Sequence, residues 1–525
     1  MEHSAARERV IIIGAGMGGL AAAIDLARRG FEVVVVEKAA APGGKMRALD
    51  VAGARIDAGP TVFTMRWVFE ELFSDAGASL GERVGMRKAE ILARHAWRTG
   101  ETLDLYADEA RSVAAISAFA GPAEASRYAA FCMEARNIYA ALEQTFIRAQ
   151  KPTPLSLVGR SGLSGLGRLA GIHPYAKLWD RLGRHFHDPH LRQLFGRYAT
   201  YCGSSPFQAP ATLMLVAHVE QQGVFLIDGG MHRLAAAMGA LASELGASLR
   251  YGVEARQIFV AGGRAAGIIL STGERIEADA VILNGDVAAL ARSLFGADCA
   301  NAAPAVANDA RSLSAVTFAM RAPTSGFPLL RHNVFFSRDY RAEFETIFGR
   351  RELPEEPTVY VCAQDRADLA EDFGGAPERL LALVNAPPTG DQHAFGEEEI
   401  GQCLKRALAA LKRCGLEIEP TAEAIATTTP RDFASLYPAT GGALYGQASH
   451  GWMASFQRPG SRSSLAGLYL AGGSVHPGPG APMAALSGRL AAASLSADRA
   501  STRRFRPAAT PGGTSTRSAM TEAAD

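Results

Sequence analysis

The first forty residues constrain the fold more than any other part of the chain. The apolar run RVIII (9–13) predicts a short buried strand, and GAGMGG follows it directly, matching the pattern G-x-G-x-x-G. Apolar residues then recur at helical spacing as far as Gly30, and EVVVVE (32–37) predicts a second buried strand. A strand, a glycine turn, a helix and a strand in this order predict a parallel βαβ unit.

Each part of such a unit has a physical role in binding a dinucleotide. Gly14 permits the tight turn, Gly16 lets the backbone approach a pyrophosphate, and Gly19 allows close packing of helix and strand. The helix N-terminus offers free N–H groups to the phosphates. Glu37 closes the second strand, where a carboxylate accepts hydrogen bonds from a ribose hydroxyl. The alternative, a glycine-rich turn without a ligand, leaves this acidic residue unexplained.

Further glycine-rich turns favour FAD over NAD as the dinucleotide. APGGKM (41–46) and DAGPT (57–61) follow the second strand closely, which suggests backbone wrapped around an extended ligand. Late in the chain, GLYLAGG (467–473) predicts a strand and a tight turn, SVHPGPG continues the turn, and residues 484–495 predict a helix. This second strand–turn–helix unit is expected to return to the same cofactor.

These four motifs together resemble the bacterial-type carotenoid desaturases of the flavin amine oxidase superfamily, over residues 9–500. GPTVFTMRWVFEELFSDAG (59–77) resembles the hydroxyneurosporene desaturases, also called 1-hydroxycarotenoid 3,4-desaturases. Phytoene desaturases and flavin amine oxidases remain alternatives because they share most of the motifs. A non-catalytic relative of the Rab escort type is disfavoured by the intact glycine turn and by Glu37.

The resemblance implies roles for individual residues. His476 is the candidate catalytic base, with a structural hydrogen bond as its alternative role. Lys45 stands where the family often has arginine, and it offers a point charge rather than a bidentate fork. The residues expected to contact FAD are Gly14, Gly16, Gly19 and Glu37 at the ADP half, Val253 at the adenine, Lys45, Met46, Pro60 and Thr61 nearer the flavin, and Gly472, Gly473 and Ser474 along the ribityl chain.

The implied reaction removes two hydrogens from C3 and C4 of an acyclic 1-hydroxycarotenoid. The flavin N5 would take a hydride and the adjacent carbon would lose a proton, so the cofactor supplies the difficult step and the protein supplies orientation in an apolar tunnel. Oxygen or a quinone is the expected terminal electron acceptor.

The fold is predicted to be α/β, with a Rossmann-like FAD-binding domain of the two-dinucleotide-binding-domain type and an interleaved α+β substrate domain. Residues 1–100, 236–296 and 435–500 are assigned to the FAD-binding domain. Residues 101–235 and 297–434 form the predicted substrate domain, which faces the membrane. The segment 501–525 is rich in small and polar residues and is expected to be disordered.

Charge and hydropathy restrict partners and location. The chain has 54 Lys plus Arg and 53 Asp plus Glu, so it lacks the basic excess of a nucleic-acid-binding protein. No metal site is predicted, since Pro189 interrupts the histidine-rich HFHDPH (185–190). The segment 148–197 combines basic and apolar residues, which is typical either of a solvated helical face or of an anionic membrane surface. With the resemblance, it predicts a cytoplasmic protein peripherally associated with the inner membrane and its lipid.

Overall fold

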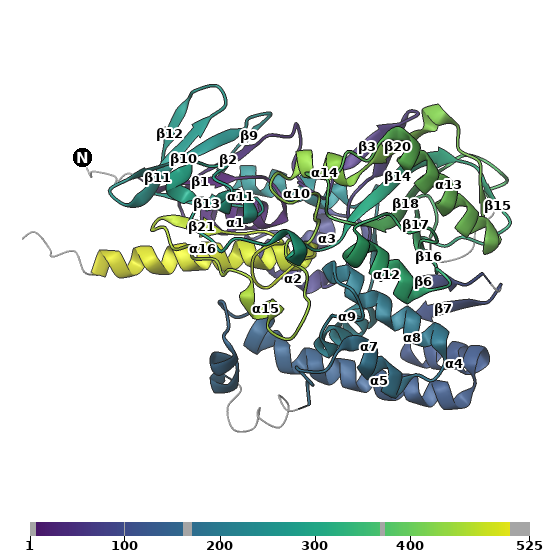
Figure 1. Ribbon diagram of the computed structural model, residues 1–525. Helices are drawn as coiled ribbons and strands as arrows, with labels where there is room; N and C mark the ends of the chain where they lie inside the picture. The colour runs from purple at the N-terminus through teal and green to yellow at the C-terminus, as the bar shows by residue number, and fades with distance from the viewer. Residues whose placement is uncertain (1–6, 99, 161–170, 368–372, 505–525) are drawn as a thin grey trace, which may run out of the picture.

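The computed structural model describes residues 7–98, 100–160, 171–367 and 373–504. Two sheets lie side by side, and a layer of helices lies below the second of them (Figure 1). The first sheet is parallel and the second is mixed. The α/β class with a Rossmann-like unit is therefore confirmed.

The parallel sheet has five strands in the order β21-β13-β1-β2-β9. Its central strand, β1, follows the predicted bounds, and the GAGMGG turn leads from it into α1, as the sequence pattern predicts. Strands from three distant parts of the chain meet in this sheet. Every neighbouring pair is parallel, so the chain must cross over between neighbours instead of turning back in a hairpin. The strands are β1 (Arg9–Ile13), β2 (Glu32–Glu37), β9 (Ser248–Tyr251), β13 (Ala280–Leu283) and β21 (Leu468–Leu470).

Both faces of the parallel sheet are covered, which explains its uninterrupted apolar strands. Val10 and Ile12 pack on the face covered by three helices, whereas Ile11 and Ile13 pack on the face covered by a small antiparallel sheet. The helices are α1 (Met17–Ala27), α10 (His232–Glu244) and α16 (Ala481–Arg504). The small sheet consists of β10 (Ala255–Ala261), β11 (Arg264–Leu270) and β12 (Arg275–Glu277).

The second sheet has seven strands in the order β20-β14-β18-β17-β16-β6-β7, with the helix α13 (Glu397–Arg413) packed on one face. Only its β16–β6 pair is parallel among the pairs of the described residues. The strands are β6 (Ile91–Ala96), β7 (Thr102–Tyr106), β14 (Ser314–Ala322), β16 (His332–Phe335), β17 (Val359–Ala363), β18 (Glu378–Ala386) and β20 (Ile425–Thr428). The predicted domain limits remain a prediction, and β6 pairs here although it falls within 1–100.

A helical layer adjoins the seven-stranded sheet and shares an apolar core with it. Its helices are α4 (Glu109–Ala120), α5 (Pro122–Leu142), α7 (Leu178–His185), α8 (Pro189–Gly196) and α9 (Leu215–Gln222). A π-helix, η1 (Glu143–Ile147), extends α5, and the 3₁₀-helix η2 (Arg197–Cys202) follows α8 directly. These two short elements matter because both reach the cavity described below.

The remaining elements connect these layers. The helices are α2 (Arg66–Asp75), α3 (Leu80–Arg83), α11 (Ala288–Ala291), α12 (Tyr340–Glu345), α14 (Pro430–Leu436) and α15 (Ala454–Gln457). The short helical turns are η3 (Ala211–Met214), η4 (Ala297–Cys299), η5 (Asn308–Ala310), η6 (Thr346–Arg350) and η7 (Ala422–Ala424). The short strands are β3 (Ala48–Val51), β4 (Ala54–Asp57), β5 (Met86–Lys88), β8 (Phe225–Ile227), β15 (Thr324–Ser325) and β19 (Glu417–Ile418).

Helix α16 differs from its prediction at both ends. It begins at Ala481 rather than at 484, because Pro482 is compatible with the first turn of a helix. It ends at Arg504, so the first four residues of the predicted disordered tail are helical. The rest of that tail, 505–525, lies outside the described residues, as do 161–170 of the predicted membrane-facing segment.

Candidate cofactor and substrate site

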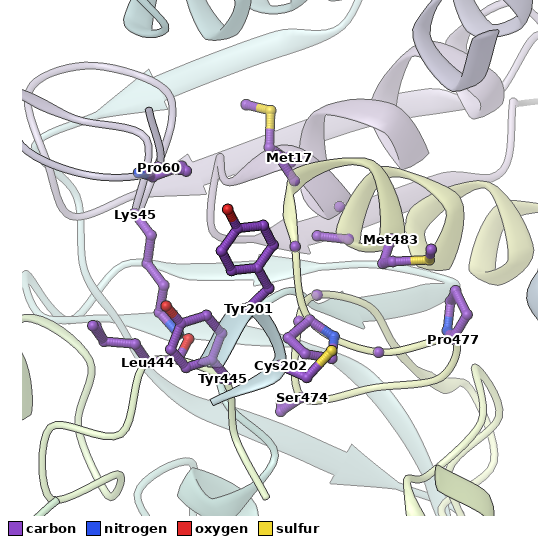
Figure 2. Close-up of a pocket in the computed structure, with 18 of the residues that line it drawn as sticks. Met17, Lys45, Pro60, Tyr201, Cys202, Leu444, Tyr445, Ser474, Pro477 and Met483 are labelled. Carbon is purple, nitrogen blue, oxygen red and sulfur yellow. The ribbon is translucent and has the colours of Figure 1, made fainter. Parts of the chain in front are cut away.

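A connected cavity of about 1440 Å³ runs between the glycine turns of the parallel sheet and the helical layer. Pockets for one small ligand measure roughly 300–1,000 Å³. The larger volume suits two ligands that meet inside the protein. Figure 2 shows Lys45 and Leu444 on one side of this cavity, Met483 and Pro477 on the other, and Tyr201 between them.

The first glycine turn forms one wall of the cavity. Gly14 has a φ of +97°, which favours glycine, and both it and Gly16 line the cavity. A Cβ on Gly16 would stand 2.9 Å from Asn284 Nδ2. Gly19 lies one turn along α1 and does not line the cavity, but a Cβ there would collide with the Gly14 carbonyl oxygen. Its geometry matches the predicted packing role.

The Glu37 carboxylate lies at the edge of this turn. Its Oε2 accepts a hydrogen bond from the Ala15 N–H at 2.7 Å, and its Oε1 accepts one from the Ala39 N–H at 2.8 Å. A carboxylate has about four acceptor positions, so two remain for a ligand. The Val253 N–H donates to the Glu37 carbonyl, and both residues line the cavity. Val253 follows β9 rather than lying in it, because the strand ends at Tyr251.

Two more turns close the dinucleotide half of the cavity. The Gly43 N–H donates to the Ala15 carbonyl at 2.9 Å, which holds the APGGK turn against the first one. Gly472 has a φ of +110°, and its N–H donates to Ser487 Oγ at 2.7 Å. The Ser474 Oγ accepts from the Val287 N–H at 3.2 Å and therefore secures a neighbouring loop. The predicted residues Lys45, Met46, Gly472, Gly473 and Ser474 all line the cavity.

Two cations, the partly buried Lys45 and the buried Arg458, face this half without a carboxylate in contact, among the residues that the structure describes. Lys45 Nζ donates to the Leu444 carbonyl at 2.6 Å, and Arg458 Nη1 donates to the carbonyls of Tyr445 and Gly473 at 3.1 Å each. Burial lowers the pKa of both side chains. Asp286 also lines the cavity. Cationic groups with free charge suit an anionic ligand such as a diphosphate.

Pro60 and Thr61 lie where the dinucleotide half meets the rest of the cavity. Thr61 Oγ1 and Tyr360 Oη share a hydrogen bond of 2.7 Å, and Tyr360 Oη is also 2.7 Å from His332 Nδ1. The sheet strand β17, which carries Tyr360, is thereby tied to the DAGPT turn. Pro60 and Thr61 thus line the same cavity as Lys45 and Met46, the other residues predicted to lie nearer the flavin.

His476 does not reach the cavity, which corrects its predicted position. Its side chain is buried, and its Nε2 donates to the Ala149 carbonyl at 2.9 Å. The ring packs edge-on against Phe146, and burial lowers its pKa to about 4. Sequence proximity to the glycine turn suggested a catalytic base, but Pro477 rather than His476 lines the cavity. The geometry supports the alternative, a structural hydrogen bond.

The other half of the cavity has mainly apolar walls. They come from the end of α5, η1, η3 and α9, namely Leu142, Phe146, Ile147, Leu213, Leu215, Val216 and Val219. This half continues to Pro154, Leu157, Ile172 and Trp452, close to the surface. Its mainly apolar lining suits a hydrocarbon ligand.

A few polar residues in the apolar half escaped the sequence analysis. Arg197 and Tyr201 enter from η2, Glu220 from α9, and Tyr360 from β17. No spacing in the sequence links them. The one available signal was the charge of Arg197 within a segment predicted to be helical. Because Arg197 belongs to the basic stretch 148–197, it was not distinguished from the other basic residues there.

The described residues fit FAD. A left-handed glycine turn at a helix N-terminus, a carboxylate at the end of β2, and cations that touch no carboxylate match a diphosphate and a ribose. Glu37, Lys45 and the glycines would hold the dinucleotide, which when bound supplies hydride acceptance. Within the described ranges, no group of three or more His, Cys, Asp or Glu side chains is arranged to hold a metal ion.

Comparisons with known proteins identify the family of the chain. The model of the flavin containing amine oxidoreductases matches residues 17–496. A hydroxyneurosporene desaturase of Rubrivivax gelatinosus is 56% identical over 515 residues, which cover 98% of each chain. A phytoene desaturase of Fusarium fujikuroi is 29% identical over 523 residues, covering 94% of this chain and 90% of that protein.

A solved structure of an oxidoreductase from Methanosarcina mazei has the same fold. It aligns with a TM-score of 0.56 at 17% identity and covers 93% of this chain and 100% of that one. Fold, cavity and sequence thus agree, and the chain belongs to the family of flavin-containing amine oxidoreductases.

Proposed function

We propose that this FAD-dependent oxidoreductase introduces the C3–C4 double bond into acyclic 1-hydroxycarotenoids during carotenoid biosynthesis. The observation that supports this function most is the mainly apolar half of the cavity, whose lining includes both Thr61 and the surface residue Trp452. A stretched polyene fits such a channel, and a short polar amine would leave most of it unfilled. The high identity to a hydroxyneurosporene desaturase supports this choice over phytoene as substrate.

The protein residues act by binding and orientation. Apolar walls exclude water from the reacting carbons and hold the chain extended, which removes rotational freedom before the hydrogens leave. C4 is allylic to the polyene, so positive charge there would spread along the chain and make the neighbouring proton acidic. A weak acceptor then suffices. In keeping with this, neither a histidine nor a pair of carboxylates lines the cavity beside Pro60 and Thr61 among the described residues, and His332 reaches Thr61 only through Tyr360.

Purified holoenzyme incubated separately with 1-hydroxyneurosporene, neurosporene and phytoene tests the function. We expect the longer polyene absorption of a 3,4-didehydro product with the hydroxylated substrate, and product identity is checked by mass spectrometry. Conversion of phytoene alone would support the phytoene desaturase alternative instead. Oxygen or a quinone, added in turn to anaerobic assays, identifies the proposed electron acceptor.

We also propose that the cavity mouth rests on a membrane surface. Leu155 and Tyr175 are 86% and 75% exposed, and the Tyr175 ring touches the Trp452 ring edge-on with centroids 5.0 Å apart. Lys151 and Arg160 are exposed nearby in the sequence. Aromatic, apolar and basic residues in one place favour an anionic lipid interface. None of the described helices is both long enough and apolar enough to span a bilayer.

Replacing Leu155 with glutamate is expected to weaken binding to phosphatidylglycerol vesicles about tenfold or more. Burial of one leucine contributes about 1.5–3 kcal/mol, and the new charge is repelled by the anionic surface. Vesicle flotation measures the bound fraction. Met133→Glu is the matched control, because Met133 is 58% exposed on α5, whereas Leu155 adjoins Pro154, which lines the cavity. Equal losses in both variants would contradict the proposed contact surface.

A further inference from the structure

A polar cluster interrupts the apolar half of the cavity and is defined by Arg197, Tyr201, Glu220 and Tyr360. Arg197 Nη1 donates to Tyr201 Oη at 3.0 Å. Its guanidinium also lies over the rings of Tyr201 and Tyr360, 5.2 Å and 5.4 Å from their centroids. Aromatic faces stabilise a cation only in part.

Arg197 has hydrogen-bonding capacity beyond these contacts. A guanidinium carries five N–H donors, and the Tyr201 bond uses one of them. Among the described residues, the Tyr201 hydroxyl is the side-chain hydrogen-bond partner of Arg197. The nearby Glu220 carboxylate accepts from Tyr198 Oη at 2.7 Å. Burial raises the pKa of Glu220, and the hydroxyls of Tyr198 and Tyr201 and the charge of Arg197 oppose this rise. Buried donors are costly unless an acceptor meets them, and the open side of Arg197 is the cavity.

The cluster lies at the inner end of the apolar half. Tyr360 is hydrogen-bonded to Thr61, next to Pro60, where this half meets the dinucleotide half. The same cavity is also lined by Tyr175 and Trp452, which are 75% and 41% exposed and mark its mouth at the surface. A substrate with one polar end that enters from a membrane therefore meets the cluster with that end and leaves its polyene toward the mouth.

The proposed substrate has such an end. Its oxygen is attached to C1, only two carbons from C3, so a group that binds this oxygen must lie beside the reacting C3–C4 bond. A polar group at the inner end of the channel meets this condition, and a polar group at the mouth does not.

We propose that Arg197, oriented by Tyr201, donates hydrogen bonds to the C1 oxygen of the substrate and thereby sets its end-group specificity. The inference rests on the proposed function and adds the residue that selects among carotenoids. Because Arg197 is a donor, it recognises oxygen lone pairs. A tertiary alcohol and its methyl ether should therefore both bind, whereas an end group without oxygen leaves the donors unpaired.

The test compares 1-hydroxyneurosporene, its 1-methyl ether and neurosporene. For each we measure kcat/KM, and also Kd for the dithionite-reduced holoenzyme under anaerobic conditions, which binds substrate without turnover. A hydrogen bond to a charged group corresponds to about a 10- to 100-fold preference for the two oxygenated chains. Arg197→Met should remove this preference by weakening the oxygenated substrates, with neurosporene changed less than about threefold.

Two further variants keep the assignment testable. Arg197→Lys retains a cationic donor and should restore part of the preference. Tyr201→Phe keeps the ring, removes the hydroxyl that orients Arg197, and should reduce the preference about fivefold. If Arg197→Met does not fold, the preference for oxygenated substrates measured in Tyr201→Phe tests the assignment.

Several results would overturn the assignment. Undiminished preference in Arg197→Met or in Tyr201→Phe would exclude these residues as the reader of the C1 oxygen. An ether that binds no better than neurosporene would point to an acceptor, such as Glu220, and against Arg197. Failure of the proposed function is a separate outcome, since wild-type enzyme would then convert no 1-hydroxycarotenoid at all.

Discussion

Replacing Gly16 with valine is expected to abolish FAD binding and activity while leaving the apoprotein folded. Gly16 lines the cavity at the N-terminus of α1, where a diphosphate must approach the backbone. The Cβ would meet Asn284 Nδ2 at 2.9 Å, and this side-chain end would have to shift from its 3.1 Å hydrogen bond to the Gly14 carbonyl. The branched side chain then fills the phosphate position. We expect FAD affinity to fall about 100-fold or more, or ~2.7 kcal/mol.

Flavin absorbance of the purified protein and reconstitution with added FAD measure this loss. Thermal unfolding of the apoprotein should match that of wild-type apoprotein. Gly19→Ala is the contrasting variant, because its Cβ would collide with the backbone of Gly14 rather than with a movable side chain. That variant should lose stability as well as FAD. A Gly16→Val protein that is purified with a full complement of flavin would contradict the assignment of this turn.

The dinucleotide half could be predicted because its signals are local. A continuous apolar strand, a glycine turn and a helix occupy consecutive residues, and β1 has the predicted bounds. The second glycine unit was predicted for the same reason. Glu37 was found by its spacing from Gly19, and the structure adds that both of its oxygens bind backbone N–H groups. The FAD contacts of individual residues remain predictions.

The substrate half could not be predicted, because its residues come together only in the fold. Arg197 and Tyr360 are 163 positions apart, yet the guanidinium lies over the ring. In the sequence, Arg197 closes a basic stretch that resembles a solvated face. His476 illustrates the opposite error, since it adjoins the glycine turn in sequence but turns toward Ala149 in the structure. Neither side-chain direction follows from periodicity.

Stability is expected to fall steeply between pH 6.5 and pH 4. Burial lowers the pKa of His95 and His332 to about 3, and of His450 and His476 to about 4, from an ordinary 6.5. In this range the unfolded chain binds protons that the folded chain excludes. The contribution of these histidines to the free energy of unfolding is therefore fully present above pH 6.5 and is lost as the pH falls. At pH 5 each of these histidines lowers the free energy of unfolding by about 2 kcal/mol.

One carboxyl group acts in the opposite direction. Burial raises the pKa of Glu343 to about 7, so the folded chain takes up this proton before the unfolded chain does, and stability rises as the pH falls from 7 toward 4.5. This gain offsets about 2 kcal/mol at pH 5. The net loss from pH 7.5 to pH 5 is then on the order of 6 kcal/mol, a large part of a typical total of about 5–15 kcal/mol. Urea midpoints at both pH values measure it.

His450 provides the matched control, because its protonation state is fixed by a contact. Its Nε2 lies 3.0 Å from the Ser205 backbone nitrogen, whose N–H it accepts, so a proton on Nε2 would break this bond. Glutamine at position 450 retains an acceptor and does not titrate. His450→Gln should therefore lose about 2 kcal/mol less than wild type between pH 7.5 and pH 5. Parallel pH profiles for the two proteins would mean that burial of this histidine does not cause the acid sensitivity.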